Sequence, residues 1–337
     1  MTQEFDIAVL GATGAVGRTI LEVLEERNFP VRNLYLLASE RSAGEKIRFK
    51  GKSIMVQNVE SFDWSQVQVA LFSAGAAASQ EWAPVAADYG VVVIDNTSCF
   101  RYDPDVPLVV PEVNPEAIAD YRDRNIIANP NCSTIQMLVA LKPIYDAVGI
   151  ERINVSTYQS VSGSGKKGID ELAGQTVRLL NSQDAEPSLY KKQIAFNCLP
   201  HIDAFMENGY TKEEMKMVWE TQKIFADASI GVNPTCVRVP VFYGHAEAVH
   251  VECTQPIDAD YAMALLSKAE GVKLFEGEDY PTQTKEAAGQ DAVMVGRIRN
   301  DISHPNGLNM WVVADNVRKG AATNAVQIAE LLVRDYL

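Results

Sequence analysis

The chain has 337 residues, of which 47% are hydrophobic and 22% charged; this composition is typical of globular proteins, and the length is sufficient for two domains. Its net charge of −14 argues against nucleic acid or an anionic membrane surface as a partner, and we expect neither a membrane span nor a signal peptide. Because the 5 cysteines form no CxxC pair, we expect a reducing, cytoplasmic environment and no metal site.

A strand, a glycine-rich turn and a helix are predicted at the start of the chain, at residues 6–10, 11–17 and 19–27. A dinucleotide-binding fingerprint has this order, because glycines let the backbone approach the pyrophosphate and the helix N-terminus stabilises its charge. The spacing is Gly-x-x-Gly-x-x-Gly rather than Gly-x-Gly-x-x-Gly. A turn that is rich in glycine only for packing therefore stays open as an alternative.

The end of the second predicted strand, at residues 31–38, bears on the choice of nucleotide. An NAD-specific site usually has an acidic residue there for the ribose hydroxyls. Here Ser39, Arg41 and Ser42 offer a cation and hydroxyl donors, which suit a 2′-phosphate. We therefore expect NADP(H), although Glu40 keeps NAD open as the alternative.

Two further buried strands are predicted at residues 67–73 and 91–95. They continue the alternation of strands and helices that is typical of an open parallel sheet, whose ligands lie beyond the carboxyl ends of the strands. We therefore expect the turns at residues 73–76 and 96–101 to face a bound cofactor.

Residues 129–134 read Asn-Pro-Asn-Cys-Ser-Thr and precede apolar residues at helical spacing. Pro130 interrupts the preceding structure, and Asn131 is expected to cap a helix whose first turn contains Cys132. The positive end of a helix dipole favours the thiolate, which is the nucleophilic form of cysteine. Cys132 is therefore a candidate nucleophile, and a buried structural thiol is the alternative.

From residue 150 the pattern changes, because residues 152–160 and 249–254 alternate as strands with one buried face do. We predict an α/β protein with two domains. The first is a Rossmann-type doubly wound domain of residues 1–127, joined by a returning C-terminal helix within 316–337. The second is an α+β domain of residues 128–315, with a largely antiparallel sheet.

Polar side chains in the second domain offer further chemistry. Arg238 alternates with apolar neighbours in a predicted strand, and a guanidinium can clamp a carboxylate by two hydrogen bonds; a surface arginine is the alternative. Glu213 and Lys216 lie three apart on a predicted helix and so on one face, although most such pairs are exposed ion pairs. Among the 4 histidines, His245 ranks first as an acid or base.

The chain resembles aspartate-β-semialdehyde dehydrogenase nearly from end to end. The segments that carry the resemblance are residues 11–17, 129–134, 159–163, 209–216, 236–245 and 315–316. Enzymes of this family reduce L-4-aspartyl phosphate with NADPH to aspartate semialdehyde and inorganic phosphate, at the branch point toward lysine, threonine and methionine. The resemblance also implies that residues 128–315 form the catalytic and dimerisation domain, and that the protein is a homodimer, which in some members pairs into a tetramer.

The resemblance assigns a role to each motif residue. Cys132 matches the nucleophile that forms a thioester, His245 the general acid and base, and Gln159 the residue that orients the acyl group. For the substrate, Arg238 is the expected ligand of the carboxylate and Glu213 that of the ammonium. Lys216 and Arg101 are the expected ligands of the phosphate. The residues that the fingerprint and the resemblance place at the cofactor are Gly11, Thr13, Gly14, Ala15, Val16, Gly17, Ser39, Arg41, Ser42, Ser73, Ser162, Gly163 and Asn316.

Other protein classes fit the sequence less well. N-acetylglutamyl-phosphate reductase performs the same chemistry, but its substrate carries no ammonium, which would leave Glu213 without a purpose. A glyceraldehyde-phosphate dehydrogenase differs in the context of the cysteine and in the position of the histidine. A non-catalytic NADP-binding sensor would be expected to lack the nucleophile or the base, and this chain has both.

Overall fold

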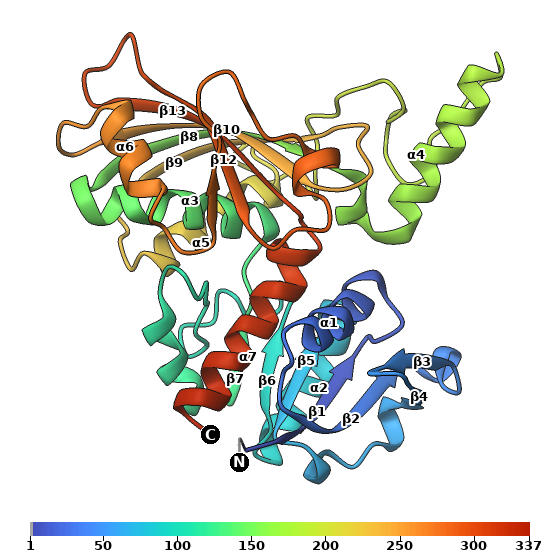
Figure 1. Ribbon diagram of the computed structural model, residues 1–337. Coiled ribbons are helices and arrows are strands. Elements are labelled where there is room, and N and C mark those ends of the chain that lie inside the picture. The colour runs from blue at the N-terminus through green and yellow to red at the C-terminus, as the bar shows by residue number, and fades with distance from the viewer. Residues whose placement is uncertain (1–2) are drawn as a thin grey trace. The chain divides into compact units, whose positions relative to one another are not determined.

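The computed structural model describes residues 3–337, and the chain divides into two compact units (Figure 1). The first unit contains the chain up to Pro130 together with Ala321–Leu337, and the second is Asn131–Gly320. The expected functional division at 127/128 and 315/316 stays a prediction, since these units are defined by packing alone. No helix within residues 3–337 is long and apolar enough to cross a membrane.

The first unit is built on a seven-stranded sheet of order β3-β4-β2-β1-β5-β6-β7. Its strands are β1 (Phe5–Leu10), β2 (Val31–Ala38), β3 (Lys46–Phe49), β4 (Lys52–Asn58), β5 (Val69–Phe72), β6 (Val92–Asp95) and β7 (Ile126–Ala128). Neighbouring strands are parallel except β3 and β4, which form an antiparallel hairpin. The parallel strands predicted from the sequence are confirmed, whereas this hairpin was not predicted. Its signal is the pair Lys50 and Gly51, whose φ values of 45° and 77° are those of a tight hairpin turn.

The helices of the first unit are α1 (Ala15–Glu26), α2 (Ala76–Asp88) and α7 (Thr323–Asp335), with shorter 3-10 segments between strands. Helix α7 contacts α1 and β6, and Arg27 Nη2 donates to Glu330 Oε2 at 2.6 Å. Ile20 and Leu24 of α1 share one buried core with Ala325 and Ile328 of α7. The C-terminal helix thus packs in the first unit, while its place in the expected NADP-binding domain stays a prediction.

The second unit contains a six-stranded sheet of order β11-β12-β13-β10-β8-β9. Its strands are β8 (Ile150–Gln159), β9 (Gly231–Arg238), β10 (His245–Cys253), β11 (Val272–Leu274), β12 (Val293–Asn300) and β13 (Gly307–Ala314). Strand β10 is antiparallel to β8 and β13, and β12 to β13, but β8–β9 and β11–β12 are parallel. The sheet is thus mixed rather than largely antiparallel. The chain between β8 and β9 passes through α4 (Gly165–Leu180) and α5 (Lys212–Ile224), and such a long crossover permits parallel pairing.

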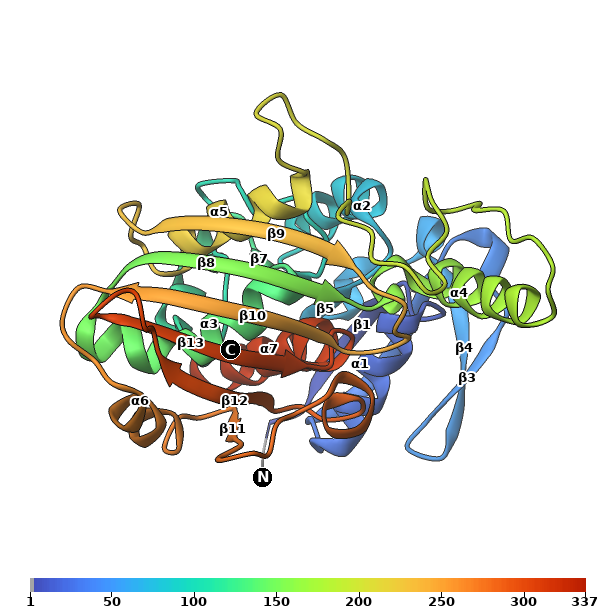
Figure 2. The same cartoon turned by 90° about the horizontal axis from the view of Figure 1, so that it is seen from above.

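Helices cover one face of this mixed sheet. Helix α3 (Cys132–Val148) contacts β8, β10, β12 and β13, while α5 contacts β9 and α6 (Ala259–Leu266) contacts β12. Figure 2 shows the sheet facing the viewer with α3 and α5 behind it. The alternating burial along the second half of β8 follows from this arrangement, because successive side chains point to opposite faces.

Candidate active site

Arg238, Gln159 and His245 form a row across three adjacent strands. Gln159 is the register partner of Arg238 on β9 and of His245 on β10. Side chains at paired positions point to the same face of a sheet. All three residues are buried on the helix-covered face, so the structure brings together residues that are up to 86 positions apart (245 − 159).

Cys132 lies in the first turn of α3, which covers this row. The side chain of Asn131 caps the helix by accepting hydrogen bonds from the backbone N–H of Ser133 at 3.0 Å and of Thr134 at 3.3 Å. The predicted cap and the position of Cys132 are both confirmed. A Cβ at Gly320 would lie 2.7 Å from the Cβ of Cys132, so the chain passes this thiol at a distance that only glycine allows.

His245 is fully buried, and its two ring nitrogens have different surroundings. Nδ1 accepts the backbone N–H of Ser160 at 3.1 Å and lies 3.2 Å from Ser160 Oγ. The neutral ring therefore carries its proton on Nε2, which has no hydrogen-bond partner among residues 3–337. Burial lowers the pKa of His245 to about 3, and the guanidinium of Arg238 acts in the same direction. The imidazole is thus neutral at physiological pH, and Nε2 is its reactive position.

Glu213 and Lys216 form a buried ion pair on α5 rather than an exposed one. Glu213 is 6% exposed, and its Oε2 accepts from Lys216 Nζ at 2.8 Å. Lys216 also donates to Asp203 Oδ2 at 2.9 Å. Burial by itself would raise the pKa of Glu213, but Lys216 and the surrounding donors lower it to about 2. Glu213 is therefore ionised inside the site, as a ligand for an ammonium group must be.

The amide of Gln159 links this carboxylate to helix α3. Its Nε2 donates to Ser133 Oγ at 2.9 Å and to Glu213 Oε1 at 3.1 Å, and Asn131 Nδ2 also donates to Glu213 Oε1 at 2.9 Å. Both N–H groups of Gln159 are therefore engaged. The expected role of Gln159, donation to an acyl oxygen, requires that one of these hydrogen bonds is exchanged.

Arg238 is one of the residues that line a cavity of about 530 Å³. Its Nη1 donates to the backbone oxygen of Ser160 at 2.7 Å, whereas its Nε has no hydrogen-bond partner in the described part of the chain. The same cavity is lined by Tyr190, Lys192 and Asp203. A buried donor without a partner beside a cavity suits the carboxylate of a small ligand.

Ser162, Gly163 and Asn316, three of the expected cofactor residues, lie in this same cluster. Asn316 Oδ1 accepts from Ser160 Oγ, Ser162 Oγ and the backbone N–H of Gly244 at 3.2, 3.0 and 3.0 Å. A Cβ at Gly163 would lie 3.1 Å from Arg238 Nη1 and 3.4 Å from His245 Nε2. A side chain at position 163 would therefore crowd the row.

In the first unit, the glycine-rich turn between β1 and α1 fits a pyrophosphate. A Cβ at Gly11 would lie 2.8 Å from the backbone carbon of Ser73, and one at Gly17 would collide with the carbonyl oxygen of Gly11. Gly14 precedes α1 and no side chain caps its first turn, so the N–H groups there are open to an anion. Thr13, Ala15 and Val16 belong to the same turn and helix start. The binding of a pyrophosphate at this turn stays a prediction.

The remaining expected ligands in the first unit follow other strands of the sheet. Ser39, Arg41 and Ser42 lie in the short turn after β2, where Arg41 and Glu40 are both exposed. Arg101 follows β6, is buried, and donates from Nη2 to the backbone oxygen of Asn96 at 2.9 Å. Since Lys216 belongs to the second unit, the joint phosphate site of Arg101 and Lys216 stays a prediction.

Comparison with known proteins agrees with both units. The model of the semialdehyde dehydrogenase NAD-binding domain matches residues 6–121, and that of the semialdehyde dehydrogenase dimerisation domain matches residues 141–319. "Aspartate-semialdehyde dehydrogenase 2" of Vibrio cholerae is 74% identical over 336 residues, which cover 100% of each chain. The chain belongs to the aspartate-semialdehyde dehydrogenase family.

Another family member and a solved structure also match along nearly the whole length. The Bacillus subtilis enzyme is 49% identical over 350 residues, with 98% of each chain covered. A crystal structure of Vibrio cholerae aspartate semialdehyde dehydrogenase II complexed with ASA has a TM-score of 0.99 and 73% identity, and the match covers 100% of both chains. The predicted family and the two-domain α/β fold are therefore confirmed.

Sequence reasoning missed several residues that hold the site together. Ser160 contacts His245, and Glu220, which is buried on α5, accepts the backbone N–H of Asn131 at 2.6 Å. Glu247 is buried two residues after His245. The sequence did indicate that Glu247 is buried, because the alternation of β10 places this charged residue on the same face as Val249 and Val251.

Proposed function

We propose that this chain catalyses the NADPH-dependent reductive dephosphorylation of L-4-aspartyl phosphate to L-aspartate 4-semialdehyde, in the biosynthesis of lysine, threonine and methionine. The observation that carries the proposal is the row of Arg238, Gln159 and His245 beneath the helix that begins at Cys132. Membership of the aspartate-semialdehyde dehydrogenase family and the match to a relative complexed with ASA support the same reaction.

The charges of the second unit complement an amino acid. Arg238 binds the substrate carboxylate through the part of its guanidinium that has no protein partner in residues 3–337. Glu213 binds the ammonium, since it is ionised and buried. Lys216 binds the phosphate, and Arg101 of the first unit is the second cation. Together these residues position the acyl carbon for attack.

Cys132 is the nucleophile in this scheme. Its sulfur forms a bond to the acyl carbon while the bond to phosphate breaks, and the electron pair leaves with the phosphate oxygen. The product is a thioester on Cys132. After reduction, the carbon–sulfur bond breaks, its electrons return to sulfur, and the aldehyde is released.

His245 holds a proton at Nε2, from which it donates a hydrogen bond to the oxyanion of each tetrahedral species. Removal of the thiol proton requires the other tautomer, with the proton on Nδ1. In that tautomer Nδ1–H donates a hydrogen bond to Ser160 Oγ, which lies 3.2 Å away. One residue therefore supports both the acid and the base roles of His245.

The first unit binds the cofactor, which we propose is NADP(H). The turn at residues 11–17 and the uncapped start of α1 hold the pyrophosphate, and Ser39, Arg41 and Ser42 hold the 2′-phosphate. Ser73 flanks the turn, while Ser162, Gly163 and Asn316 border the nicotinamide. When bound, the nicotinamide supplies the hydride that reduces the thioester.

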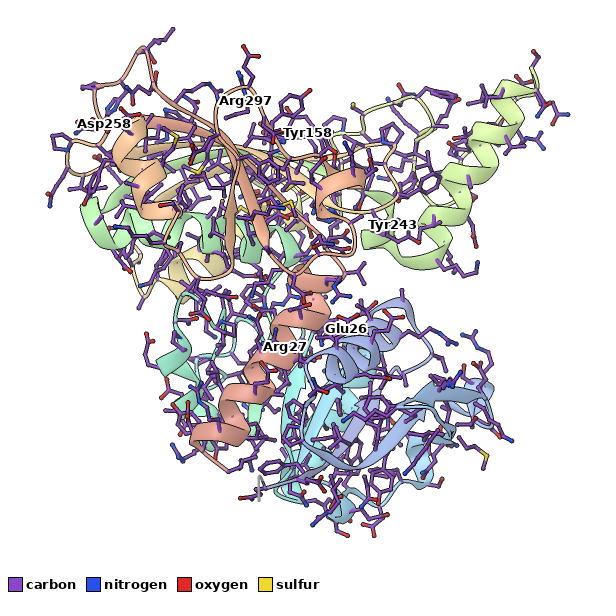
Figure 3. The ribbon with its side chains drawn as sticks, viewed as in Figure 1. Glu26, Arg27, Tyr158, Tyr243, Asp258 and Arg297 are labelled. Carbon is purple, nitrogen blue, oxygen red and sulfur yellow. The ribbon has the colours of Figure 1, made fainter. Side chains whose placement is uncertain are left out.

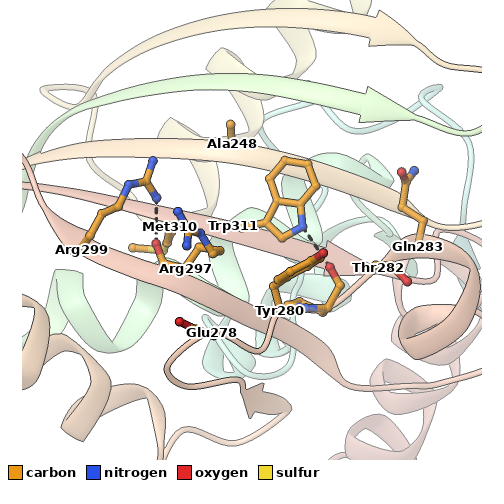
Figure 4. Close-up of a pocket in the computed structure, with 10 residues that line it drawn as sticks. Ala248, Glu278, Tyr280, Thr282, Gln283, Arg297, Arg299, Met310 and Trp311 are labelled. Carbon is orange, nitrogen blue, oxygen red and sulfur yellow. Dashed lines mark hydrogen bonds between the residues drawn. The ribbon is translucent and has the colours of Figure 1, made fainter.

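We further propose that the protein is a cytoplasmic homodimer that uses the sheet face opposite α3. This face carries a cavity of about 660 Å³ lined by Tyr280, Arg297, Met310 and Trp311 (Figure 4). Tyr158 packs against Trp311 with ring centroids 5.4 Å apart, and Figure 3 shows Tyr158 and Arg297 on the side of the sheet away from α3. The match to a dimerisation domain supports a homodimer, and five free cysteines support a reducing compartment.

Phosphate-dependent reduction of NADP by the purified protein tests the proposal. We expect activity with L-aspartate semialdehyde and none with N-acetylglutamate semialdehyde, which offers no ammonium to Glu213. Activity with the N-acetyl compound alone would keep the chemistry but refute the ammonium site. Activity with neither, although NADPH binds, would favour a non-catalytic sensor.

A further inference from the structure

Glu220 is a buried carboxyl group on α5 to which the proposed chemistry gives no role. It is 0% exposed, and its Oε2 accepts the backbone N–H of Asn131 at 2.6 Å. The two residues are 89 positions apart in the chain, so this bond is a tertiary contact between α5 and the start of α3. Asn131 immediately precedes Cys132, and the bond therefore fixes the residue next to the proposed nucleophile.

Every polar group of Asn131 has at least one partner. Its side-chain and backbone oxygens accept from N–H groups of the first turns of α3, at 2.9–3.3 Å. Its side-chain Nδ2 donates to Glu213 Oε1 at 2.9 Å, and its backbone N–H donates to Glu220. Two carboxyl groups of α5 thus hold the residue that caps α3.

These two carboxyl groups differ in what else they bind. Glu213 and Glu220 lie seven positions apart, which is about two turns, and so on one face of α5. Glu213 also accepts from Lys216 and Gln159, and it is the proposed ligand of the substrate ammonium. Its bond to Asn131 therefore competes with the substrate. Glu220 is not among the proposed ligands, so its bond to Asn131 can persist through the reaction.

Cys132 has little room to move on its other side. A Cβ at Gly320 would lie 2.7 Å from the Cβ and 3.3 Å from the Cα of Cys132. The nucleophile is thus enclosed between Gly320 and the anchored Asn131. Exact placement of a reacting atom matters, because a displacement of about 1 Å can cost about a hundredfold in rate.

We infer that Glu220 is a positioning residue for the reaction: it accepts the backbone N–H of Asn131 and so holds Cys132 in place while Glu213 exchanges partners with the substrate ammonium. The inference rests on the proposed function, because it concerns the proposed nucleophile. Without an acceptor at position 220, the buried N–H of Asn131 loses its partner, and the start of α3 must shift to find another. That shift displaces the sulfur of Cys132 from the acyl carbon.

Three variants of Glu220 test whether its acceptor oxygen acts in this way. Glu220→Gln keeps an oxygen in the same place, so we expect at least about half of the wild-type kcat. Glu220→Asp withdraws the oxygen by one methylene, and Glu220→Leu removes it. In both, kcat should fall about tenfold or more, while KM for L-aspartate semialdehyde and for NADP stays within about threefold.

Thr221→Val is the matched control. Thr221 is the next residue of α5, is also 0% exposed, and its Oγ1 has no hydrogen-bond partner among residues 3–337. Its kcat should stay within about twofold of wild type. A residue that only stabilises the fold would lower the urea midpoint without lowering kcat per folded chain, so both quantities are measured for each variant.

Failure of the proposed function is distinguishable, because it would show as an inactive wild-type protein in the same assay. An unchanged kcat in Glu220→Leu would overturn the inference. Equal losses in Glu220→Gln and Glu220→Leu would also overturn it, since they would show that an acceptor oxygen is not what matters. Should Glu220→Leu fail to fold, Glu220→Asp decides the question, and wild-type kcat in that variant would refute the role of the bond to Asn131.

Discussion

At the scale of single residues, the site depends on side chains whose hydrogen-bonding capacity is only partly used. Arg238 donates a hydrogen bond from Nη1 to the backbone oxygen of Ser160, and its Nε has no partner in residues 3–337. His245 Nδ1 accepts a hydrogen bond from the backbone N–H of the same residue, and its Nε2 has no partner in this range. Ser160 thus orients both the guanidinium of Arg238 and the imidazole of His245. Arg238 Nε and His245 Nε2 have no hydrogen-bond partner in the described residues.

Arg238→Lys tests the carboxylate site. A lysine supplies one charge but not two parallel hydrogen bonds, so we expect KM for L-aspartate semialdehyde to rise about tenfold to hundredfold, the equivalent of one charged hydrogen bond of about 1.5–3 kcal/mol. KM for NADP should not change. Arg48→Lys, at an exposed position of β3, is the matched control. Unchanged kinetics in Arg238→Lys would show that the carboxylate binds elsewhere.

The burial of His245 allows a prediction of how the free energy of unfolding depends on pH. Its pKa is about 3 in the folded protein and near 6.5 when unfolded, so between these values the unfolded chain binds the extra proton and stability falls as the pH falls. His245→Gln lacks this effect. Relative to wild type, its free energy of unfolding should therefore improve by about 2 kcal/mol between pH 7 and pH 5, measured by urea denaturation. A difference that stays constant with pH would contradict the burial of a neutral imidazole.

At the scale of elements, local patterns were predictable and contacts between distant segments were not. The cap at Asn131 and the start of α3 follow from six consecutive residues, and both are confirmed. The spacing of Glu213 and Lys216 places them on one face of α5, but it does not reveal that this face is buried. The row of Arg238, Gln159 and His245 depends on strand register, which only the folded sheet defines.

The mixed sheet has the same explanation. Alternation along β8 and β10 predicts one buried face for each strand, but not whether a neighbour runs parallel or antiparallel. That direction depends on the connection, and the helices between β8 and β9 allow parallel pairing. The glycine-rich turn was easier to predict from the sequence, because its strand, turn and helix are contiguous.

The turn after β2 makes a prediction about cofactor choice. Arg41 is exposed there and available to a 2′-phosphate. Arg41→Ala should therefore raise KM for NADPH far more than KM for NADH, because only the former carries the extra phosphate. Comparison of both cofactors under the same conditions checks this, with Arg48→Ala as the surface control. Equal effects on the two cofactors would locate the 2′-phosphate at another residue.

At the scale of the whole molecule, the sheet of the second unit has two different faces. One is covered by α3, α5 and α6, and the other carries Tyr158, Met310 and Trp311 with Arg297 and Arg299 around a cavity. A patch with aromatic and arginine side chains resembles the centre of a protein interface. The proposed homodimer places a second copy on this face.

Trp311→Lys tests that assembly. The added charge lies beside Arg297 and Arg299, so it should repel the same surface of a second copy and shift the mass measured by light scattering from dimer to monomer. Trp82→Lys, on α2 of the first unit, is the control and should remain dimeric. A dimer that persists in Trp311→Lys would place the interface on another surface.

The central claim, that the reaction proceeds through a thioester on Cys132, is tested most directly by the mass of the protein after incubation with L-aspartate semialdehyde and NADP in the absence of phosphate. Without phosphate the acyl group cannot be released as the acyl phosphate. We predict one aspartyl group per chain, located by peptide mapping on Cys132, formed with one equivalent of NADPH and removed when phosphate is added. NADPH formation without an adduct, or an adduct on another cysteine such as Cys99, would contradict the mechanism.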